Sequence, residues 1–186
     1  MGLMRNRSPR AFVASIVAGL NNGMGQLVGV GIACAVAGLV VGTLSMADLT
    51  GKISSGMFTL AGGSYALTLL VATVVIILLG MGMPTPAVYA LAAVLAAPAL
   101  LALKIELLPA HLFIVYFASL SAITPPVAVA AFAAASIARA NPIAVAFLAC
   151  RVGIVAFVLP LVFVNQPGVL LMGDAATVVT TIGFVL

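Results

Sequence analysis

Long apolar stretches separated by a few polar positions run along the whole chain. No charged residue occurs from Ala11 to Met46, and none occurs between Lys52 and Lys104. About 20 apolar residues in a helix cross a bilayer core of about 30 Å, so each of these stretches is long enough for at least one membrane span. The pattern therefore predicts an all-α integral membrane protein.

The first apolar stretch is too long for one span, because a helix from Ala11 to Met46 would measure about 54 Å. We expect this helix to break at the cluster Asn21–Gly25, which is rich in asparagine and glycine. The break would divide the region into two parts. Residues 1–25 would form a basic tail and an interfacial arm helix, and residues 26–62 a first transmembrane span and an interfacial linker.

Two interruptions without charge lie in the next region, residues 63–140. One reads Gly-Met-Gly-Met-Pro-Thr-Pro over 80–86, and the other reads Ser-Ala-Ile-Thr-Pro-Pro over 121–126. A backbone group left unpaired in hydrocarbon costs several kcal/mol, so such breaks persist only when they are buried in protein or line a small polar cavity. Two breaks flanked by short apolar helices are typical of the substrate and ion site of a transporter. Residues 63–140 are therefore the predicted transport core.

The first interruption is expected to be the tip of a helical hairpin. Its arms would be Ser64–Leu79 and Ala87–Leu103, and Pro98 is expected to interrupt the second arm. The charges do not distinguish a re-entrant hairpin from two full spans, because the tip is uncharged. The lack of polar side chains at the tip favours a hairpin whose tip is buried.

The second interruption is expected to divide one helix into two halves, from Ala110 to Leu120 and from Val127 to Ala138. Thr124 precedes two prolines, which lack backbone donors and disfavour helical geometry in the residue before them. The carbonyl groups of the preceding turn would then lose their partners and face an ion or water. The alternative is a proline kink in which Thr124 bonds back to its own helix.

The remaining residues, 141–186, predict an interfacial helix, a further span and an incomplete last helix. The interfacial piece is Ile143–Cys150, and the span is Arg151–Asn165, with Pro160 inside it. The last segment, Ala175–Leu186, begins like another span but stops early. That early stop predicts a truncated or split permease.

Composition agrees with the membrane prediction. The 186 residues are 65% hydrophobic and 5% charged, whereas ordinary soluble domains carry about 25% charged residues. The net charge of +4 comes from basic residues scattered between the spans, which form no patch for nucleic acid and instead indicate topology. The arginines are expected on the cytoplasmic side and the lysines outside: Arg5, Arg7, Arg10, Arg139 and Arg151, against Lys52 and Lys104.

Few side chains suggest other chemistry. The sequence shows no cluster of His, Cys and carboxylate for a metal and no pair of nucleophile and base, so we expect no enzyme. Cys34 and Cys150 are interpreted as small buried apolar residues rather than as a disulfide or metal pair. For His111, interface packing is favoured over a proton relay. Tyr89 and Tyr116 fit either aromatic packing or a substrate path.

Several motifs, in the same order along the chain, resemble those of the DctM-like large membrane component of TRAP (tripartite ATP-independent periplasmic) transporters. They are Gly80–Tyr89, which is similar to the second-hairpin motif, and the segments Leu95–Leu100, Ala110–Ala118 and Leu120–Val127. The resemblance extends over roughly residues 25–165. It is strongest to the type that fuses the small and large components, in the C-terminal half of that type.

The resemblance implies a secondary transporter with an elevator mechanism in a bacterial inner membrane. It also implies two inverted repeats, each with a hairpin and a broken helix, of which this chain would carry the C-terminal one. No Ser-Gly-Ser motif of a first hairpin is found before residue 60, and no small-component region is found. The implied partners are the N-terminal permease half, the small membrane component, a periplasmic substrate-binding protein, the lipid bilayer and an organic anion.

The resemblance also implies roles for both interruptions. Backbone groups and the Thr85 hydroxyl at the hairpin tip would lie near the ion or substrate, and the broken helix would supply oxygens for sodium. The implied substrate- and ion-binding residues are Gly80, Gly82, Pro84, Thr85, Pro86, Ser121, Thr124 and Pro125, with Thr124 and Ser121 as sodium ligands. Sodium would be the coupling ion, and no cofactor is expected.

Other interpretations stay open. The hairpin tip could be a tight structural turn without a binding role. The whole chain could be a membrane assembly or anchor subunit that does not transport, or an inactive permease fragment. A passive channel is disfavoured, because the sequence shows no ring of charge and no polar stripe that could line a pore.

Overall fold

The computed structural model describes residues 9–170, and every regular element in that part of the chain is helical. The elements are α1 (Pro9–Met46), α2 (Leu49–Leu60), α3 (Tyr65–Leu79), α4 (Thr85–Ala102), α5 (Leu107–Leu120), α6 (Val129–Ala138), α7 (Pro142–Val152), α8 (Ile154–Asn165) and a short 3-10 helix, η1 (Pro167–Leu170). The predicted all-α fold is confirmed. The expected last helix, Ala175–Leu186, and the basic residues Arg5 and Arg7 lie outside the described residues.

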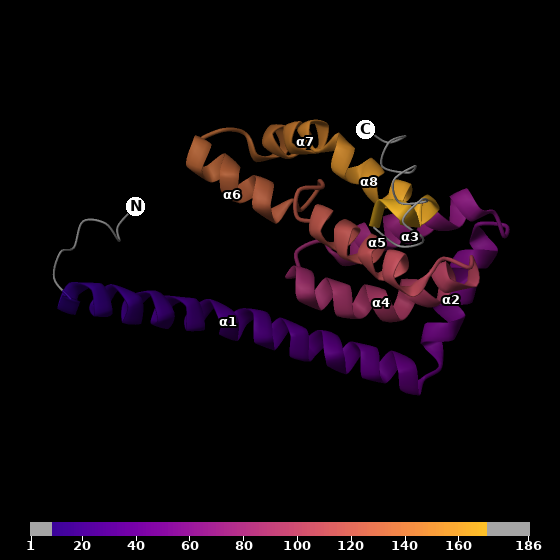
Figure 1. Cartoon of the computed structure of the whole chain (residues 1–186), viewed down its shortest axis with the longest axis horizontal. Coiled ribbons are helices and arrows are strands. Elements are labelled where there is room, and N and C mark those ends of the chain that lie inside the picture. Colours follow the sequence, from indigo (N-terminus) through magenta and orange to yellow (C-terminus); the bar gives the residue numbers. More distant parts are fainter. Residues whose placement is uncertain (1–8, 171–186) are drawn as a thin grey trace.

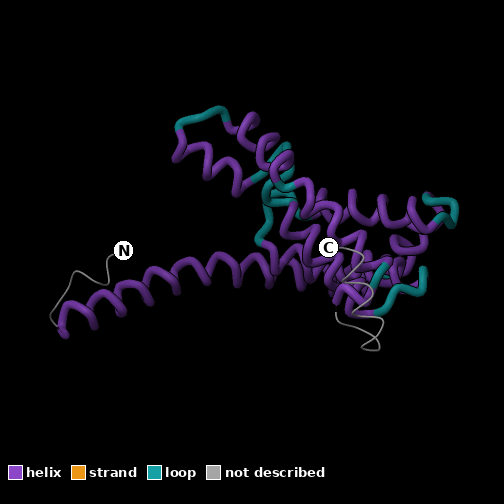
Figure 2. The backbone as a smooth tube through the Cα atoms, turned by 45° about the horizontal axis from the view of Figure 1, so that its top comes forward, coloured by secondary structure: helices purple, strands orange, loops and turns teal. Residues whose placement is uncertain are grey.

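Three helices, α3, α4 and α5, form the body of the molecule (Figure 1). α3 and α4 are the arms of a hairpin, α5 packs along both arms, and α8 packs on α5. α1 and α2 also pack against α4. The first part of α1 and the pair formed by α6 and α7 project beyond this body in both views (Figures 1 and 2). α4 therefore lies at the centre of the body, in contact with α1, α2, α3 and α5.

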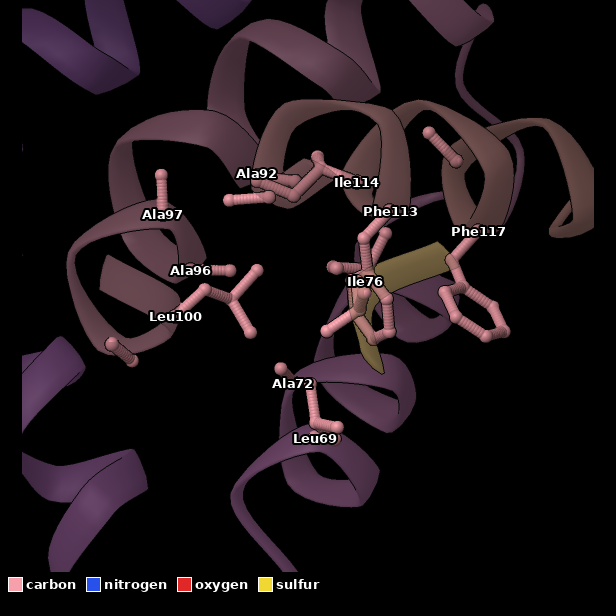
Figure 3. Packing of buried hydrophobic residues seen from close by; sticks show 14 of the residues in the cluster. Leu69, Ala72, Ile76, Ala92, Ala96, Ala97, Leu100, Phe113, Ile114 and Phe117 are labelled. Atoms are coloured by element: carbon pink, nitrogen blue, oxygen red, sulfur yellow. The ribbon is translucent and has the colours of Figure 1, made fainter. Parts of the chain in front are cut away.

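α4 can occupy this central position because its buried side chains are small. Alanines make up more than half of its buried residues, among them Ala92 and Ala96. In hydrocarbon, helices associate through close packing, which small side chains permit. Larger side chains from the neighbouring helices fill the space between the backbones, with Ile76 from α3 and Phe113 from α5 lying together (Figure 3).

The helices differ in whether they could cross a membrane. Among the described residues, Phe12–Met46 and Thr85–Ala102 are each long and apolar enough, and α6 with α7 form a third candidate that is bent by 117°. α3, α5 and α8 are apolar but shorter. The 15 residues of α3 reach about 22 Å, which is less than the thickness of a bilayer core. The length of this arm favours a hairpin that enters and leaves the membrane from one side.

The predicted break at Asn21–Gly25 is wrong. α1 continues through these residues as one helix of 38 residues. A glycine inside a helix costs about 1 kcal/mol, whereas an unpaired backbone group in apolar surroundings costs several kcal/mol. Between Gly19 and Gly42, no glycine has a neighbouring atom within 4 Å of the position that a Cβ would take. No packed group therefore bends α1 at its glycines.

Pro98 also fails to interrupt the second hairpin arm. α4 runs from Thr85 to Ala102 with Pro98 inside it, so this prediction is wrong. The proline ring is exposed, while Ala97 and Ala99 on either side are buried. Packing on both sides of the proline holds α4 continuous although one backbone hydrogen bond is missing. Pro160 lies inside α8, but the predicted pass Arg151–Asn165 is not one helix, because α7 ends at Val152 and the 12 residues of α8 begin at Ile154.

Candidate functional site

The hairpin tip, residues 80–84, is a compact turn between α3 and α4. Its first residue, Gly80, caps α3 and donates its N–H to Ile76 O at 2.9 Å. Gly82 has a φ of +86°, a left-handed backbone conformation that glycine adopts without steric cost. Gly80 is buried, while Gly82 is exposed. The turn therefore presents part of its backbone to the body of the protein and part to the surroundings.

The first turn of α4 contains a hydroxyl group, that of Thr85, without a hydrogen-bond partner among the described residues. Pro84 O accepts hydrogen bonds from Ala87 N and Val88 N at 3.0 and 3.1 Å, and Pro86 has no N–H. Among the described residues, no hydrogen bond involves the hydroxyl of Thr85, which is half-buried. A helix N-terminus carries partial positive charge and favours anions. The partial charge at the start of α4 and the Thr85 hydroxyl favour a negatively charged group, although the N–H groups of Ala87 and Val88 already have Pro84 O as their acceptor.

The broken helix is interrupted over residues 121–128, between α5 and α6, as the two prolines predicted. Ala128 has a φ of +32°, and the peptide bond between Pro125 and Pro126 is cis. Ala130 N–H donates to Ala122 O at 2.9 Å across the interruption. The prediction of two half-helices is confirmed, although the second half begins at Val129.

The carbonyl groups of the turn before the prolines are not free, and that expectation is wrong. Every carbonyl group of residues 120–124 accepts a hydrogen bond. The bonds are Ile123 N and Thr124 Oγ1 to Leu120 O, Thr124 N to Ser121 O, Ala130 N to Ala122 O, Cys150 Sγ to Ile123 O, and Ala128 N to Thr124 O. Local turns and the neighbouring α7 replace the donors that the prolines lack. An ion at this place would use the remaining lone pairs of these oxygens.

Thr124 adopts the back-bonded geometry that was the alternative to free carbonyl groups. Its hydroxyl donates to Leu120 O at 2.8 Å, one helical turn earlier. The bond uses the proton of the hydroxyl and leaves lone pairs on its oxygen. The back-bonded hydroxyl can therefore still accept a cation, and the sodium role of Thr124 stays a prediction.

The two interruptions meet at Gly80 and Ser121, which are 41 residues apart in the sequence. Ser121 Oγ lies 3.1 Å from Gly80 O and 2.7 Å from Ala118 O, and both Gly80 and Ser121 are buried. A second approach lies nearby, because a Cβ on Gly82 would be 3.7 Å from Val127 Cγ1. The sequence assigned residues from two separate motifs to one site, and these two contacts bring the motifs together.

Two residues to which the sequence assigned no role in the site also contact the broken helix. Cys150 Sγ donates a weak hydrogen bond to Ile123 O at 3.4 Å. A Cβ on Gly153 would lie 3.5 Å from Ile123 Cδ1. Both residues belong to the corner between α7 and α8, and the signal that could have found this corner was a glycine between two apolar segments. Cys34 and Cys150 are both free thiols and are half-buried rather than fully buried.

A hollow of about 440 Å³ lies beside the interruption of the broken helix. Its lining is almost entirely apolar and consists of Thr124, Pro125, Phe147, Cys150, Ile154 and Phe157. The hydroxyl of Thr124 and the thiol of Cys150 are the polar side-chain groups in this lining. Another hollow, of about 490 Å³, lies between α3, α5 and α8 and includes none of the predicted site residues.

The site is built from neutral groups. The chain carries no charge between Lys52 and Lys104, and no group of three or more His, Cys, Asp or Glu within residues 9–170 could hold a metal ion. The oxygens at the two interruptions belong to hydroxyl and backbone carbonyl groups. Such oxygens suit a monovalent cation, whereas a divalent cation usually recruits carboxylates.

His111 and the two central tyrosines take part in aromatic packing. Tyr89 Oη lies 3.0 Å from His111 Nδ1, and the two rings are arranged edge to face between α4 and α5. Tyr116 meets Phe163 of α8 in a similar way, with ring centroids 5.4 Å apart. This geometry agrees with the packing interpretation of His111.

Comparison with known proteins agrees with the motifs. The family model described as "Tripartite ATP-independent periplasmic transporter, DctM component" matches residues 2–175. This range is wider than the region over which the motifs resemble the family. No curated protein and no solved structure matches the chain. Because the match includes the hairpin, the broken helix and nearly all the rest of the sequence, the chain belongs to the DctM component family of tripartite ATP-independent periplasmic transporters.

Proposed function

We propose that this chain acts in the permease of a sodium-coupled secondary transporter in a bacterial inner membrane. The permease takes up small organic anions, carboxylates in particular, which a periplasmic binding protein delivers. The observation that carries this proposal is the buried contact between Gly80 and Ser121. It joins a helix start that favours anions to an interruption rich in neutral oxygens, and together these groups make one site for an anion and a cation.

Electrostatics gives a reason for coupling the two solutes. A carboxylate or a sodium ion alone loses much of its hydration energy when it enters an apolar interior. When both ions bind side by side, their attraction offsets part of that cost, so each ion raises the affinity of the site for the other. In this scheme Thr85 and the start of α4 contact the anion, while Thr124 and neighbouring carbonyl oxygens contact sodium.

The elevator arrangement assigns different roles to the parts of the chain. The hairpin and the broken helix carry the site and move together as one transport core. The N-terminal permease half supplies the second inverted repeat, and the small membrane component adds to the fixed scaffold. The long apolar α1, whose first part projects beyond the body (Figure 1), contributes surface for these partners and for lipid.

The charges at the ends of the helices give a topology that can be tested. α2 and the end of α4 line a common hollow, so Lys52 and Lys104 lie at the same end of the hairpin. The turn between α6 and α7, which contains Arg139, lies toward the opposite end (Figure 1). With basic residues favoured in the cytoplasm, we expect Lys52 and Lys104 outside and Arg139 inside.

Cysteine labelling in intact cells checks this topology. In a permease with Cys34 and Cys150 replaced by serine, the variants Lys52→Cys and Lys104→Cys should react with a membrane-impermeant maleimide. Arg139→Cys should react only after permeabilisation. The opposite pattern would reverse the topology.

Uptake into proteoliposomes tests the proposed function. The permease would be reconstituted with its partner subunits, the periplasmic binding protein and a radiolabelled carboxylate that this binding protein retains in equilibrium dialysis. We expect uptake that requires both the binding protein and an inward sodium gradient. Uptake that is unchanged when potassium replaces sodium would reject sodium coupling, and the absence of uptake under every ion gradient would reject the transport function.

A further inference from the structure

One buried hydroxyl connects the hairpin tip to the broken helix. Ser121 is 2% exposed, and its Oγ lies within hydrogen-bonding distance of Gly80 O and of Ala118 O. A hydroxyl has one proton, so Ser121 shares it between the carbonyl group of the tip and that of its own helix. Among residues 9–170, this is the one hydrogen bond that joins residues 80–86 to residues 121–128.

The shape of the contact explains why residue 80 is glycine. The backbone of Gly80 has φ −76° and ψ −8°, an ordinary helical conformation that any residue adopts. Glycine is therefore not needed here for its conformational freedom. A Cβ on Gly80 would collide with the Oγ and Cβ atoms of Ser121. Gly80 is required by the close approach of Ser121.

We propose that Ser121 is a positioning residue that latches the hairpin tip onto the broken helix. This proposal rests on the proposed function, because it concerns the site through which the transported ions pass. Ser121 acts by fixing the distance between the two interruptions, so that the oxygens of the hairpin tip and of the broken helix keep their relative positions. This positioning role differs from that of a sodium ligand, in which Ser121 would bind the ion directly.

Four variants separate the latch from other roles. Ser121→Ala removes the hydroxyl, and Ser121→Gly removes the whole side chain. Gly80→Ala places a methyl group where the Ser121 side chain lies. The double variant Gly80→Ala with Ser121→Gly restores the space, because the added methyl group then has no side chain to meet.

The rate at which a cysteine in the tip reacts with a maleimide measures the latch without any transport. Met81→Cys would be introduced into the full permease with Cys34→Ser and Cys150→Ser. Loss of one hydrogen bond in Ser121→Ala should raise this rate roughly two- to tenfold. Gly80→Ala should raise it at least as much, and the double variant should return it to the rate of Ser121→Gly alone. Ser119→Ala is the matched control, since the Ser119 hydroxyl bonds within α5 to Val115 O and is exposed; its rate should stay at that of the parent.

Several outcomes would overturn the latch. It fails if Ser121→Ala leaves the thiol rate unchanged, or if the double variant reacts faster than Ser121→Gly alone. It also fails if Ser121→Ala changes only the sodium concentration for half-maximal uptake, because that result assigns a ligand role. If the rates change as expected in a permease that transports no carboxylate under any ion gradient, the latch is supported and the proposed transport function is rejected.

Discussion

Replacing Phe113 with alanine is expected to destabilise the helical body by about 3–5 kcal/mol, the usual cost of removing a fully buried phenylalanine. The Phe113 side chain is 0% exposed, and its ring meets that of Phe117 edge to face, with centroids 4.8 Å apart. It lies where α3, α4 and α5 pack together (Figure 3). The cavity left by the ring would loosen all three helices.

Unfolding of the detergent-solubilised permease by increasing amounts of sodium dodecyl sulfate, followed by circular dichroism, measures this loss of stability. Phe12→Ala is the control, because Phe12 lies on α1 and is 46% exposed. Its stability should stay close to that of the parent. Equal losses in the two variants would show that the hairpin and α5 do not form the core.

Replacing Thr124 with valine is expected to raise the sodium concentration for half-maximal uptake by about tenfold, since a ligand worth about 1.4 kcal/mol changes affinity by that factor. Valine keeps the shape of threonine and removes the hydroxyl. The prolines at 125 and 126 keep the chain from continuing as a regular helix, so expression and folding should be close to those of the parent.

A matched control separates loss of a sodium ligand from loss of a hydrogen bond. The Thr68 hydroxyl donates to Ser64 O at 2.8 Å, the same one-turn geometry as that of Thr124 to Leu120 O. Thr68 lies in α3, away from both interruptions. Thr68→Val should therefore leave the sodium dependence of uptake unchanged. A Thr124→Val permease with the sodium dependence of the parent would remove Thr124 from the ion site.

The interruptions were predictable because each contains residues whose backbone chemistry forbids a regular helix. Gly82 adopts a left-handed conformation, and Pro125 with Pro126 removes two donors from consecutive positions. These are local properties, so the sequence located both breaks to within a few residues. The breaks also carry no charge and are flanked by short apolar helices, and this pattern predicted a common site, whose role in binding stays a prediction.

The other features of the fold and of the site depend on packing between helices, which the periodicity of the sequence does not reveal. Asn21–Gly25 and Pro98 are weak local signals against a helix, and the apolar surroundings and neighbouring helices outweigh them. The carbonyl groups near Thr124 acquire donors from local turns and, in the case of Ile123 O, from Cys150 on α7. The contact between Gly80 and Ser121 is likewise a property of how the hairpin folds onto α5.

A disulfide between the hairpin tip and the broken helix tests most directly whether the two interruptions form one site. A Cβ on residue 82 would lie 3.7 Å from Val127 Cγ1, so side chains at positions 82 and 127 are in contact and cysteines there can approach to disulfide distance. In a permease with Cys34→Ser and Cys150→Ser, the pair Gly82→Cys with Val127→Cys should oxidise readily. The control pair Gly82→Cys with Ser136→Cys should stay reduced, because position 136 is about 10 Å further along α6 from its start.

The reaction would be followed as protection of both thiols from a polyethylene glycol maleimide, together with uptake before and after addition of a reductant. We expect oxidation to protect the pair at 82 and 127, and the disulfide between the tip and the broken helix to change uptake reversibly. If both thiols of that pair remain free under the oxidising conditions, as those of the control pair do, the two interruptions do not meet, and they do not form a single site.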